Sequence, residues 1–178
     1  MDTLDIGGGF SGKAEKEAEN YEASQIINSA LNEYFPDENV QIISEPGQFL
    51  AEQSCLLATN IHSKKVTVND AGENVYHYYA TDGIYQSFNM IHSHQWPVYP
   101  KLLSPPTSSK TYLSTIWGRA CDASDVIAKN IQLPEVNIGD WIVYENFGAY
   151  RRVVSCGFNG FKDHPIIGFI SQKDWLVL

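Results

Sequence analysis

Apolar positions in the first third of the chain follow two different periods. Leu4-Asp5-Ile6 and Val40-Gln41-Ile42-Ile43-Ser44 are typical of short buried strands. Between them, apolar residues recur at the spacing of one helical face, namely Ala23, Ile27, Ala30, Leu31 and Tyr34. Pro36-Asp37 ends this helix. The pattern predicts a strand–helix–strand unit, the building block of parallel α/β architecture.

A change in composition near Gln53 marks a second region, in which short apolar runs alternate with turn residues such as Asn69-Asp70-Ala71-Gly72. We predict strands over residues 56–59, 66–68, 75–80, 112–116, 141–144, 152–155 and 166–170. One helix is predicted over residues 123–130 and a loop over 99–110. Many short strands with Gly, Asn and Pro punctuation indicate a β-sandwich or barrel.

The first region cannot stand as a closed structure, because two strands and a helix leave apolar edges and faces exposed. Residues 1–53 are therefore predicted to be the C-terminal end of an α/β barrel that continues upstream of Met1. Residues 54–178 are predicted to form a β-sandwich domain. The fold class that follows is mainly β, with an incomplete α/β unit in front.

Composition narrows the functions open to the chain. The 178 residues hold 12 Lys and Arg against 21 Asp and Glu, a net charge of −9, so no basic face for nucleic acid is expected. Three cysteines without Cys-x-x-Cys spacing favour free thiols in a reducing compartment. Residues 1–6 lack the features of a secretory signal, and no apolar run approaches the roughly 18 residues of a membrane span. We expect a cytoplasmic protein with no nucleic-acid or membrane partner.

Four stretches carry the candidate chemistry, in the order Gly7-Gly8-Gly9, Glu45-Pro46-Gly47, Trp117-Gly118-Arg119-Ala120-Cys121-Asp122 and Glu145-Asn146-Phe147-Gly148-Ala149-Tyr150. Glycines between a strand and a helix let backbone N–H groups approach a phosphate, although three glycines are also a common turn. Together the four stretches resemble the C-terminal half of the eukaryotic ornithine decarboxylases. These pyridoxal-phosphate (PLP) enzymes have close paralogues in the non-catalytic antizyme inhibitors. The resemblance implies an alanine-racemase-like PLP-binding (β/α)8 barrel followed by a Greek-key-like β-sandwich.

The resemblance assigns cofactor-binding residues to both regions. Gly7, Gly8 and Gly9 would hold the PLP phosphate, which the hydroxyl of Tyr150 would also meet. Glu45, in its turn with Gly47, would face the pyridine nitrogen and keep it protonated, so that the ring accepts electrons. Without that context, a Glu before Pro-Gly is a turn residue and a strand Tyr packs in the core.

The resemblance also assigns residues to the substrate side. In similar enzymes the Cys matching Cys121 reaches across a dimer interface to protonate the reacting carbon, and the Asp matching Asp122 contacts the distal amine of the substrate. Phe158 would line the substrate pocket, and Gly148 would lie at the dimer interface. These matches imply a homodimer, or a heterodimer with a related subunit, and a small basic amino acid as substrate. The plain alternatives are a buried Cys beside a capping Asp, and a Phe in a core or turn.

Several positions depart from the family pattern. Gln48 replaces a phosphate-binding Arg, and Arg119 replaces a Pro, adding charge and freedom to the loop that aims Cys121. Ser93 and His94 stand where these decarboxylases carry a Tyr-Asp pair that holds the substrate ammonium group. His92 and His94 have the spacing of a strand metal site, but no third ligand is identifiable and no metal is predicted.

Two main functions stay open. The chain resembles part of an ornithine decarboxylase, which converts L-ornithine to putrescine and CO2 in polyamine biosynthesis. Alternatively, it is a degenerate, antizyme-inhibitor-like or truncated paralogue that acts through protein binding, with antizyme contacted through the upstream barrel. A decarboxylase with a changed substrate is a third reading. Because the family's PLP-binding Lys would lie upstream of Met1, we expect the chain alone to be inactive.

Overall fold

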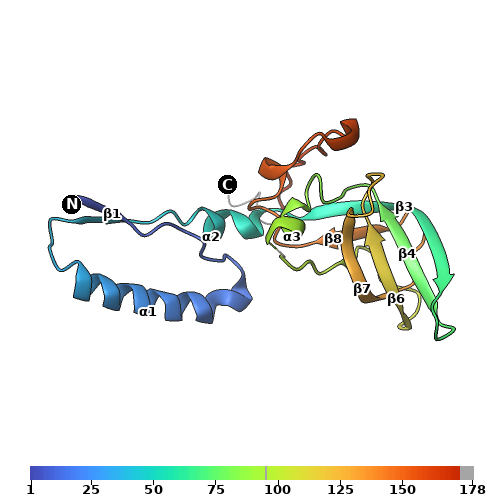
Figure 1. Cartoon of the computed structure of the whole chain (residues 1–178), viewed down its shortest axis with the longest axis horizontal. Helices are drawn as coiled ribbons and strands as arrows, with labels where there is room; N and C mark the ends of the chain where they lie inside the picture. Colours follow the sequence, from blue (N-terminus) through green and yellow to red (C-terminus); the bar gives the residue numbers. More distant parts are fainter. Residues whose placement is uncertain (95, 173–178) are drawn as a thin grey trace.

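The computed structural model describes residues 1–94 and 96–172, arranged as an α/β unit followed by a curled sheet (Figure 1). In the α/β unit, β1 (Thr3–Asp5) pairs in parallel with β2 (Gln41–Ile43). The long helix α1 (Glu17–Tyr34) connects them, entered through a short 3-10 turn, η1 (Ala14–Lys16). The predicted strand–helix–strand unit is thereby confirmed.

The sheet contains six strands in the order β5-β8-β3-β4-β6-β7. In chain order they are β3 (Leu57–Val68), β4 (Asn74–Ala80), β5 (Lys101–Leu102), β6 (Thr111–Trp117), β7 (Val126–Pro134) and β8 (Trp141–Tyr144). Helix α2 (Gly47–Ala51) and the turn η2 (Glu52–Ser54) lead from the α/β unit into β3. Helix α3 (Asn89–His94) lies between β4 and β5. The prediction of a mainly β chain is confirmed.

Strand β3 belongs to both halves of the curled sheet. Its first residues pair antiparallel with β8, from Leu57 opposite Tyr144 onward, and its later residues pair antiparallel with β4. The pairing with β8 ends at Asn60 and that with β4 begins at Ile61, followed by a register shift between Ile61 and Ser63. Residues 56–59 and 66–68 are thus one continuous strand, because the polar residues between them lie on a paired strand with one exposed face.

The core fills the inside of the curl with side chains from both halves. Phe88 packs edge-on against Tyr144, with ring centroids 4.8 Å apart, and against Phe147 at 5.3 Å. The fully buried Tyr78 accepts a hydrogen bond at its hydroxyl oxygen from the Val136 N–H, at 3.1 Å. Ile61, Ile116, Ile127 and Ile142 complete this interior.

The predicted helix over residues 123–130 is wrong. Strand β7 occupies this stretch and pairs antiparallel with β6, with Val126 opposite Trp117 and Ala128 opposite Ile116. Asp122 caps a tight turn instead of a helix, since its Oδ1 accepts the Ser124 N–H at 2.7 Å. A partner strand, which the local pattern does not reveal, decided the conformation.

The strands predicted over residues 152–155 and 166–170 are also wrong. Arg152–Val154 forms a 3-10 turn, η3, and Phe158–Gly160 forms another, η4, while residues 166–170 carry no regular structure. Apolar runs of this length become strands only where another strand offers hydrogen bonds. The predicted loop over 99–110 is confirmed except for the two residues of β5.

Candidate active site

The glycine segment Gly7–Gly9 lies at the end of β1, directly beside the end of β2. The Glu45 N–H donates to the Gly7 carbonyl at 2.8 Å, and the Gly7 N–H donates to the Asp5 carboxylate at 2.7 Å. Gly7 and Gly9 have φ angles of +69° and +87°, and a Cβ on Gly8 would overlap the carbonyl oxygen of Glu45. Both outer glycines therefore need left-handed backbone, and the middle one permits the contact with Glu45.

Glu52 ties the segment that follows these glycines to the start of the sheet. Its side chain is buried and accepts hydrogen bonds from the Ser11 hydroxyl at 2.7 Å and the Gly12 N–H at 3.0 Å. The Lys13 ammonium lies 3.6 Å away. Burial works to raise the pKa of Glu52, but these hydrogen bonds and the Lys13 charge lower it overall. Glu52 is therefore a carboxylate held in place by three groups of one loop.

The loop that carries Gly148 and Tyr150 meets the same residue from the other side. The Gly148 N–H donates to the Glu52 carbonyl at 3.0 Å, and a Cβ on Gly148 would overlap the carbonyl oxygen of Ala51. A contact within the chain thus already requires glycine at 148. Tyr150 has a φ of 51°, and its half-exposed ring lies edge-on to Trp96 with centroids 6.2 Å apart. Glu52 thus contacts the loop after the glycine segment with its side chain, and the Gly148 loop with its backbone carbonyl.

Gly47 and Gln48 begin α2, close to this junction. The Gly47 N–H donates to the Glu45 carbonyl at 2.8 Å, which closes the turn between β2 and α2. The amide of Gln48 helps to lower the pKa of the Glu52 carboxyl, as the weakest of the groups that do so. Gln48 is neutral, so it brings an amide and no charge to this part of the molecule.

A second cluster forms around the buried carboxylate of Asp125. It accepts hydrogen bonds from the Ile84 N–H at 2.8 Å and the Ala120 N–H at 2.7 Å. A Cβ on Gly83 or Gly118 would overlap this carboxylate, so both glycines are needed for its approach. Burial raises the pKa of Asp125, although the two backbone N–H groups act against that shift. Asp125 therefore fixes the Trp117-Gly118 end of the loop that leads to Cys121.

Asp122 and Phe158, both predicted on the substrate side, are brought together by Tyr85. The Tyr85 hydroxyl donates to Asp122 Oδ2 at 2.6 Å, and its ring stacks on Phe158 with centroids 4.1 Å apart. The hydrogen bond to the Asp122 carboxylate raises the pKa of Tyr85 to about 12. Tyr85 consequently stays protonated at neutral pH and orients one carboxylate oxygen.

Cys121 is exposed beside this cluster, and the loop before it is held more firmly than the sequence predicted. Arg119 donates to the Lys162 carbonyl at 2.8 Å and, at 3.4 Å, to the Gln86 side chain. Its guanidinium also lies 4.5 Å from the centroid of the Phe161 ring. The expectation that Arg119 gives this loop freedom is wrong, because Arg119 anchors the loop to the C-terminal segment.

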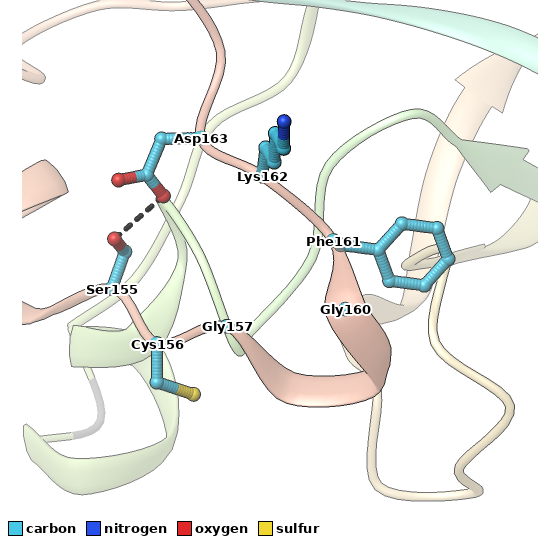
Figure 2. Close-up of a pocket in the computed structure, with 7 residues that line it drawn as sticks. All are labelled: Ser155, Cys156, Gly157, Gly160, Phe161, Lys162 and Asp163. Atoms are coloured by element: carbon cyan, nitrogen blue, oxygen red, sulfur yellow. Dashed lines mark hydrogen bonds between the residues drawn. The ribbon is translucent and has the colours of Figure 1, made fainter.

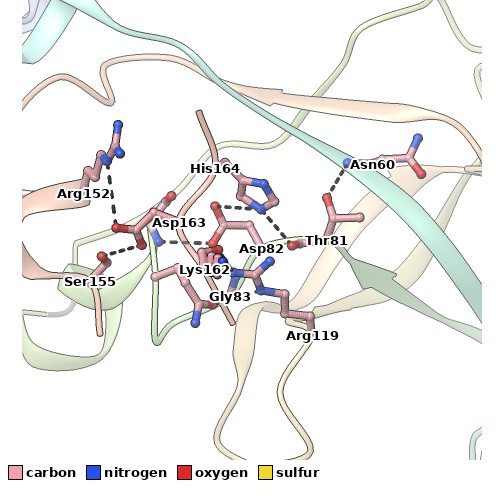
Figure 3. A network of polar contacts seen from close by, with 12 residues as sticks. Asn60, Thr81, Asp82, Gly83, Arg119, Arg152, Ser155, Lys162, Asp163 and His164 are labelled. Atoms are coloured by element: carbon pink, nitrogen blue, oxygen red, sulfur yellow. Dashed lines mark hydrogen bonds and ion pairs between the residues drawn. The ribbon is translucent and has the colours of Figure 1, made fainter. Parts of the chain in front are cut away.

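Other polar contacts hold the C-terminal segment on the sheet (Figure 3). His164 Nε2 lies 3.0 Å from the Thr81 carbonyl oxygen and 3.9 Å from the buried Asp82 carboxylate. Arg152 approaches Asp163 at 3.9 Å, and the Ser155 hydroxyl donates to the same carboxylate at 2.6 Å. The Asp82 carboxylate also accepts the N–H of Gly83 at 2.7 Å.

Residues 155–163 of the C-terminal segment form a loop around an open pocket of about 370 Å³ (Figure 2). It is lined by Ser155, Cys156, Gly157, Gly160, Phe161, Lys162 and Asp163. None of the predicted site residues lines it, so the pocket is a feature of the loop itself.

Two further predictions concern residues on and around α3. Ser93 and His94 belong to this helix, but their side chains lie outside the described residues. Among the side chains that the structure describes, those of residues 1–91 and 96–172, no three His, Cys, Asp or Glu are grouped to hold a metal ion. No helix in these ranges is long and apolar enough to cross a membrane.

Sequence reasoning missed four residues that organise the two clusters, namely Glu52, Tyr85, Asp125 and Arg151. Tyr85 and Asp125 stood next to recognised motifs, Asp82-Gly83 and Cys121-Asp122. The sequence did offer one signal for Asp125: Gly83 and Gly118, which leave room for its carboxylate against the backbone. Glu52 and Arg151 carried no local signal.

Comparison with known proteins supplies the evolutionary context of this geometry. Residues 17–148 match the family model of the pyridoxal-dependent decarboxylase C-terminal sheet domain. The chain is 39% identical over 188 residues to the ornithine decarboxylase of Cricetulus griseus, covering 100% of this chain and 41% of the relative. It is 40% identical over 183 residues to antizyme inhibitor 2 of Xenopus laevis, covering 97% and 40%. The chain thus spans about two fifths of the length of these curated relatives.

A solved structure shares both fold and sequence with the chain. The arginine decarboxylase of Paramecium bursaria Chlorella virus, bound to agmatine, superimposes with a TM-score of 0.78 at 36% identity. The superposition covers 90% of this chain and 42% of that one. Its similarity extends over the α/β unit as well as the sheet, since 90% coverage exceeds what either region alone provides.

Proposed function

Since the chain belongs to the pyridoxal-dependent decarboxylase family, we propose that it forms the C-terminal part of an ornithine-decarboxylase-like protein. The observation that carries this proposal is that Glu52 joins the loop after the glycine segment, through Ser11 and Gly12, to the loop of Gly148 and Tyr150. In this proposal residues 1–53 complete a PLP-binding barrel and residues 54–178 form the sheet domain. The assembled protein converts L-ornithine to putrescine and CO2 in the cytoplasm.

The residues at this junction fit a phosphorylated cofactor. Gly8 leaves no room for a side chain beside Glu45, and two nitrogens of the buried Arg151 guanidinium have no hydrogen-bond partner in the part of the chain that the structure describes. Gly7 to Gly9 and Tyr150 would hold the PLP phosphate, and Glu45 would face the pyridine nitrogen. PLP, when bound, supplies an electron sink for the carbon that loses CO2. The chain's own task here is to bind and orient the cofactor.

The second cluster has the groups needed on the substrate side. Asp122 would accept the distal ammonium group of a small basic amino acid, with its carboxylate oriented by Tyr85. Phe158, stacked on Tyr85, would form the wall beside the substrate chain. The exposed thiol of Cys121 would then deliver a proton to the carbon that has lost CO2. These groups would serve the site of a partner subunit, in a homodimer or a heterodimer with a related decarboxylase.

A second candidate is an antizyme-inhibitor-like protein without catalytic activity. The 40% identity to antizyme inhibitor 2 favours it as much as the decarboxylase match favours the enzyme. Gln48 brings no charge to the junction, and Ser93 and His94 bring no carboxylate to the substrate side. In this reading the upstream barrel would contact antizyme, and the two clusters would keep only their structural roles.

One experiment separates the two candidates. PLP is titrated by absorbance, and CO2 release from ornithine, lysine and arginine is measured, on this chain and on a form extended upstream through the barrel. The enzyme proposal expects a visible band of lysine-bound PLP and CO2 release in the extended form, with the Cys121→Ala variant releasing at least about tenfold less. A folded extended form with neither band nor CO2 would overturn the enzyme proposal and favour protein binding.

A further inference from the structure

Arg151 is a buried cation whose hydrogen-bonding capacity is largely unused. The residue is only 6% exposed, and among the described residues neither Nε nor Nη1 finds a hydrogen-bond partner. A guanidinium group carries five N–H donors and is charged throughout the physiological pH range. Burying such donors without an acceptor is costly, so an acceptor that reached them would be bound favourably.

Aromatic rings account for part of the environment of this cation. The guanidinium carbon lies 4.2 Å from the centroid of the Phe147 ring and 5.3 Å from that of Trp96. Cation–π contacts of this kind stabilise the charge over the ring faces. Among the described residues they leave Nε and Nη1 without acceptors, and buried surroundings of low polarity strengthen any hydrogen bond to an anion.

Glu52, the acidic residue whose charge acts on Arg151, is already bonded to other groups. The Glu52 charge acts on Arg151, yet within the described residues no carboxylate lies within ion-pair distance of its guanidinium. The Glu52 carboxylate instead receives Ser11 and Gly12, with Lys13 at 3.6 Å. Arg151 therefore holds a positive charge between the two loops while the local carboxylate is occupied.

Its position in the chain links Arg151 to both candidate phosphate-binding segments. It directly follows Tyr150, and the Gly148 N–H of the same loop donates to the Glu52 carbonyl. The Glu52 side chain in turn contacts the loop that follows Gly9. Tyr150 itself has a left-handed backbone, with a φ of 51°, which is unfavourable for a residue that carries a side chain.

We propose that Arg151 binds a phosphate monoester at the junction between the α/β unit and the sheet. Resting on the proposed function, the ligand is the phosphate group of PLP, and Arg151 brings to it the charge that the neutral Gln48 lacks. A phosphate offers several acceptor oxygens and full negative charge, which match the unpaired donors of a guanidinium.

Inorganic phosphate tests the binding group without any cofactor chemistry. Thermal unfolding of this chain is followed in potassium phosphate and in potassium chloride of equal ionic strength, for the natural sequence, Arg151→Gln and Arg152→Gln. We expect phosphate to stabilise the natural chain and Arg152→Gln alike, and Arg151→Gln to need at least about tenfold more phosphate. Equal phosphate dependence of the natural chain and Arg151→Gln would overturn the proposal.

Arg151→Lys guards against a folding defect in Arg151→Gln, because it keeps the charge and the aliphatic stem but loses the planar donor array. Weaker phosphate binding by Arg151→Lys supports the assignment, and unchanged binding overturns it. All variants are compared only after far-UV circular dichroism shows the sheet spectrum of the natural chain.

A second experiment uses the cofactor itself in place of inorganic phosphate. The barrel-extended form is titrated with PLP and with pyridoxal, which lacks the phosphate. Arg151→Gln is expected to weaken PLP binding and leave pyridoxal binding unchanged, and an equal effect on both ligands would contradict the assignment. Phosphate binding that depends on Arg151, without CO2 release, would contradict only the proposed function. CO2 release together with phosphate binding that is unchanged in Arg151→Gln would contradict only this inference.

Discussion

The α/β unit and the curled sheet differ sharply in how much side-chain surface they bury. Helix α1 and strands β1 and β2 contain no fully buried residue, and Ile26 on α1 is 64% exposed. In the sheet, Tyr78 and Ile116 are completely buried. A segment gains most of its stability from packing its apolar face, so the sheet holds itself together and the α/β unit depends on its hydrogen bonds.

This difference teaches where the two regions depend on each other. Strands β1 and β2 pair within the α/β unit. The unit is tied to the start of the sheet mainly by Glu52, which accepts hydrogen bonds from Ser11 and Gly12. The prediction that this unit completes a barrel stays a prediction, and the exposed apolar side chains of α1 are what such a barrel would cover. The junction is therefore the part of this chain where assembly and cofactor binding would be coupled.

Truncating one isoleucine in each region should give the largest difference in unfolding free energy. Ile116→Ala removes a fully buried side chain and should lower the free energy of unfolding of the sheet by about 2–5 kcal/mol. Ile26→Ala, the matched control on α1, should change it by less than about 0.5 kcal/mol. Urea unfolding monitored by tryptophan fluorescence measures both. Comparable losses of unfolding free energy in the two variants would contradict this difference between the regions, since they would mean that α1 is packed in solution.

Adding a methyl group at the junction tests whether the two regions are tightly fitted. Gly148→Ala places a Cβ on the carbonyl oxygen of Ala51 and should cost about 1–3 kcal/mol of stability through displacement of the loop. Gly157→Ala is the control, since a Cβ there meets open space. The measurement is urea unfolding at concentrations where sedimentation shows a monomer. A loss seen only in the dimer would reassign the role of Gly148 to an interface.

The pH dependence of stability tests the carboxylate that joins the regions. Because the pKa of Glu52 is lowered on folding, its contribution is fully present above the ordinary Glu pKa of about 4.3 and is lost as pH falls through the lowered value. Glu52→Gln should therefore cost on the order of 1 kcal/mol near pH 7, and the gap to the natural chain should close toward pH 3. A gap that stays constant in urea midpoints from pH 3 to pH 7 would contradict this role.

The smallest effect concerns a single tyrosine in the sheet region. Asp122→Asn removes the carboxylate that accepts the Tyr85 hydroxyl, so the pKa of Tyr85 should fall from about 12 toward its ordinary value of about 10. Ultraviolet titration of tyrosinate, with Tyr85→Phe as the reference that lacks this group, isolates the change. An identical titration of Asp122→Asn and the natural chain would mean that the hydrogen bond is not formed in solution.

Local patterns predicted elements whose conformation depends on their own residues. Helix α1 and the parallel strands β1 and β2 followed from apolar spacing. Strand β8 matched its predicted bounds, 141–144. In each case neighbouring residues in the sequence define the period or the turn, so a single stretch contains enough information.

Predictions failed where a distant partner chooses the conformation. Residues 126–134 form a strand because β6 lies beside them, and residues 166–170 remain irregular because no strand pairs with them. Arg119 was expected to loosen its loop, yet the carbonyl of Lys162, 43 residues away, holds it. Hydrogen-bond partners this far apart leave no period in the sequence.

The sequence by itself determined the family, the mainly β class and the residue types that could serve a PLP decarboxylase. These depend on motifs whose order and spacing are written in one dimension. Only the tertiary structure decided that Tyr85 joins Asp122 to Phe158, that Asp125 needs two glycines, and that two buried nitrogens of Arg151 have no hydrogen-bond partner among the described residues. The physical reason is that burial and desolvation, which give these groups their energies, exist only once separate segments pack together.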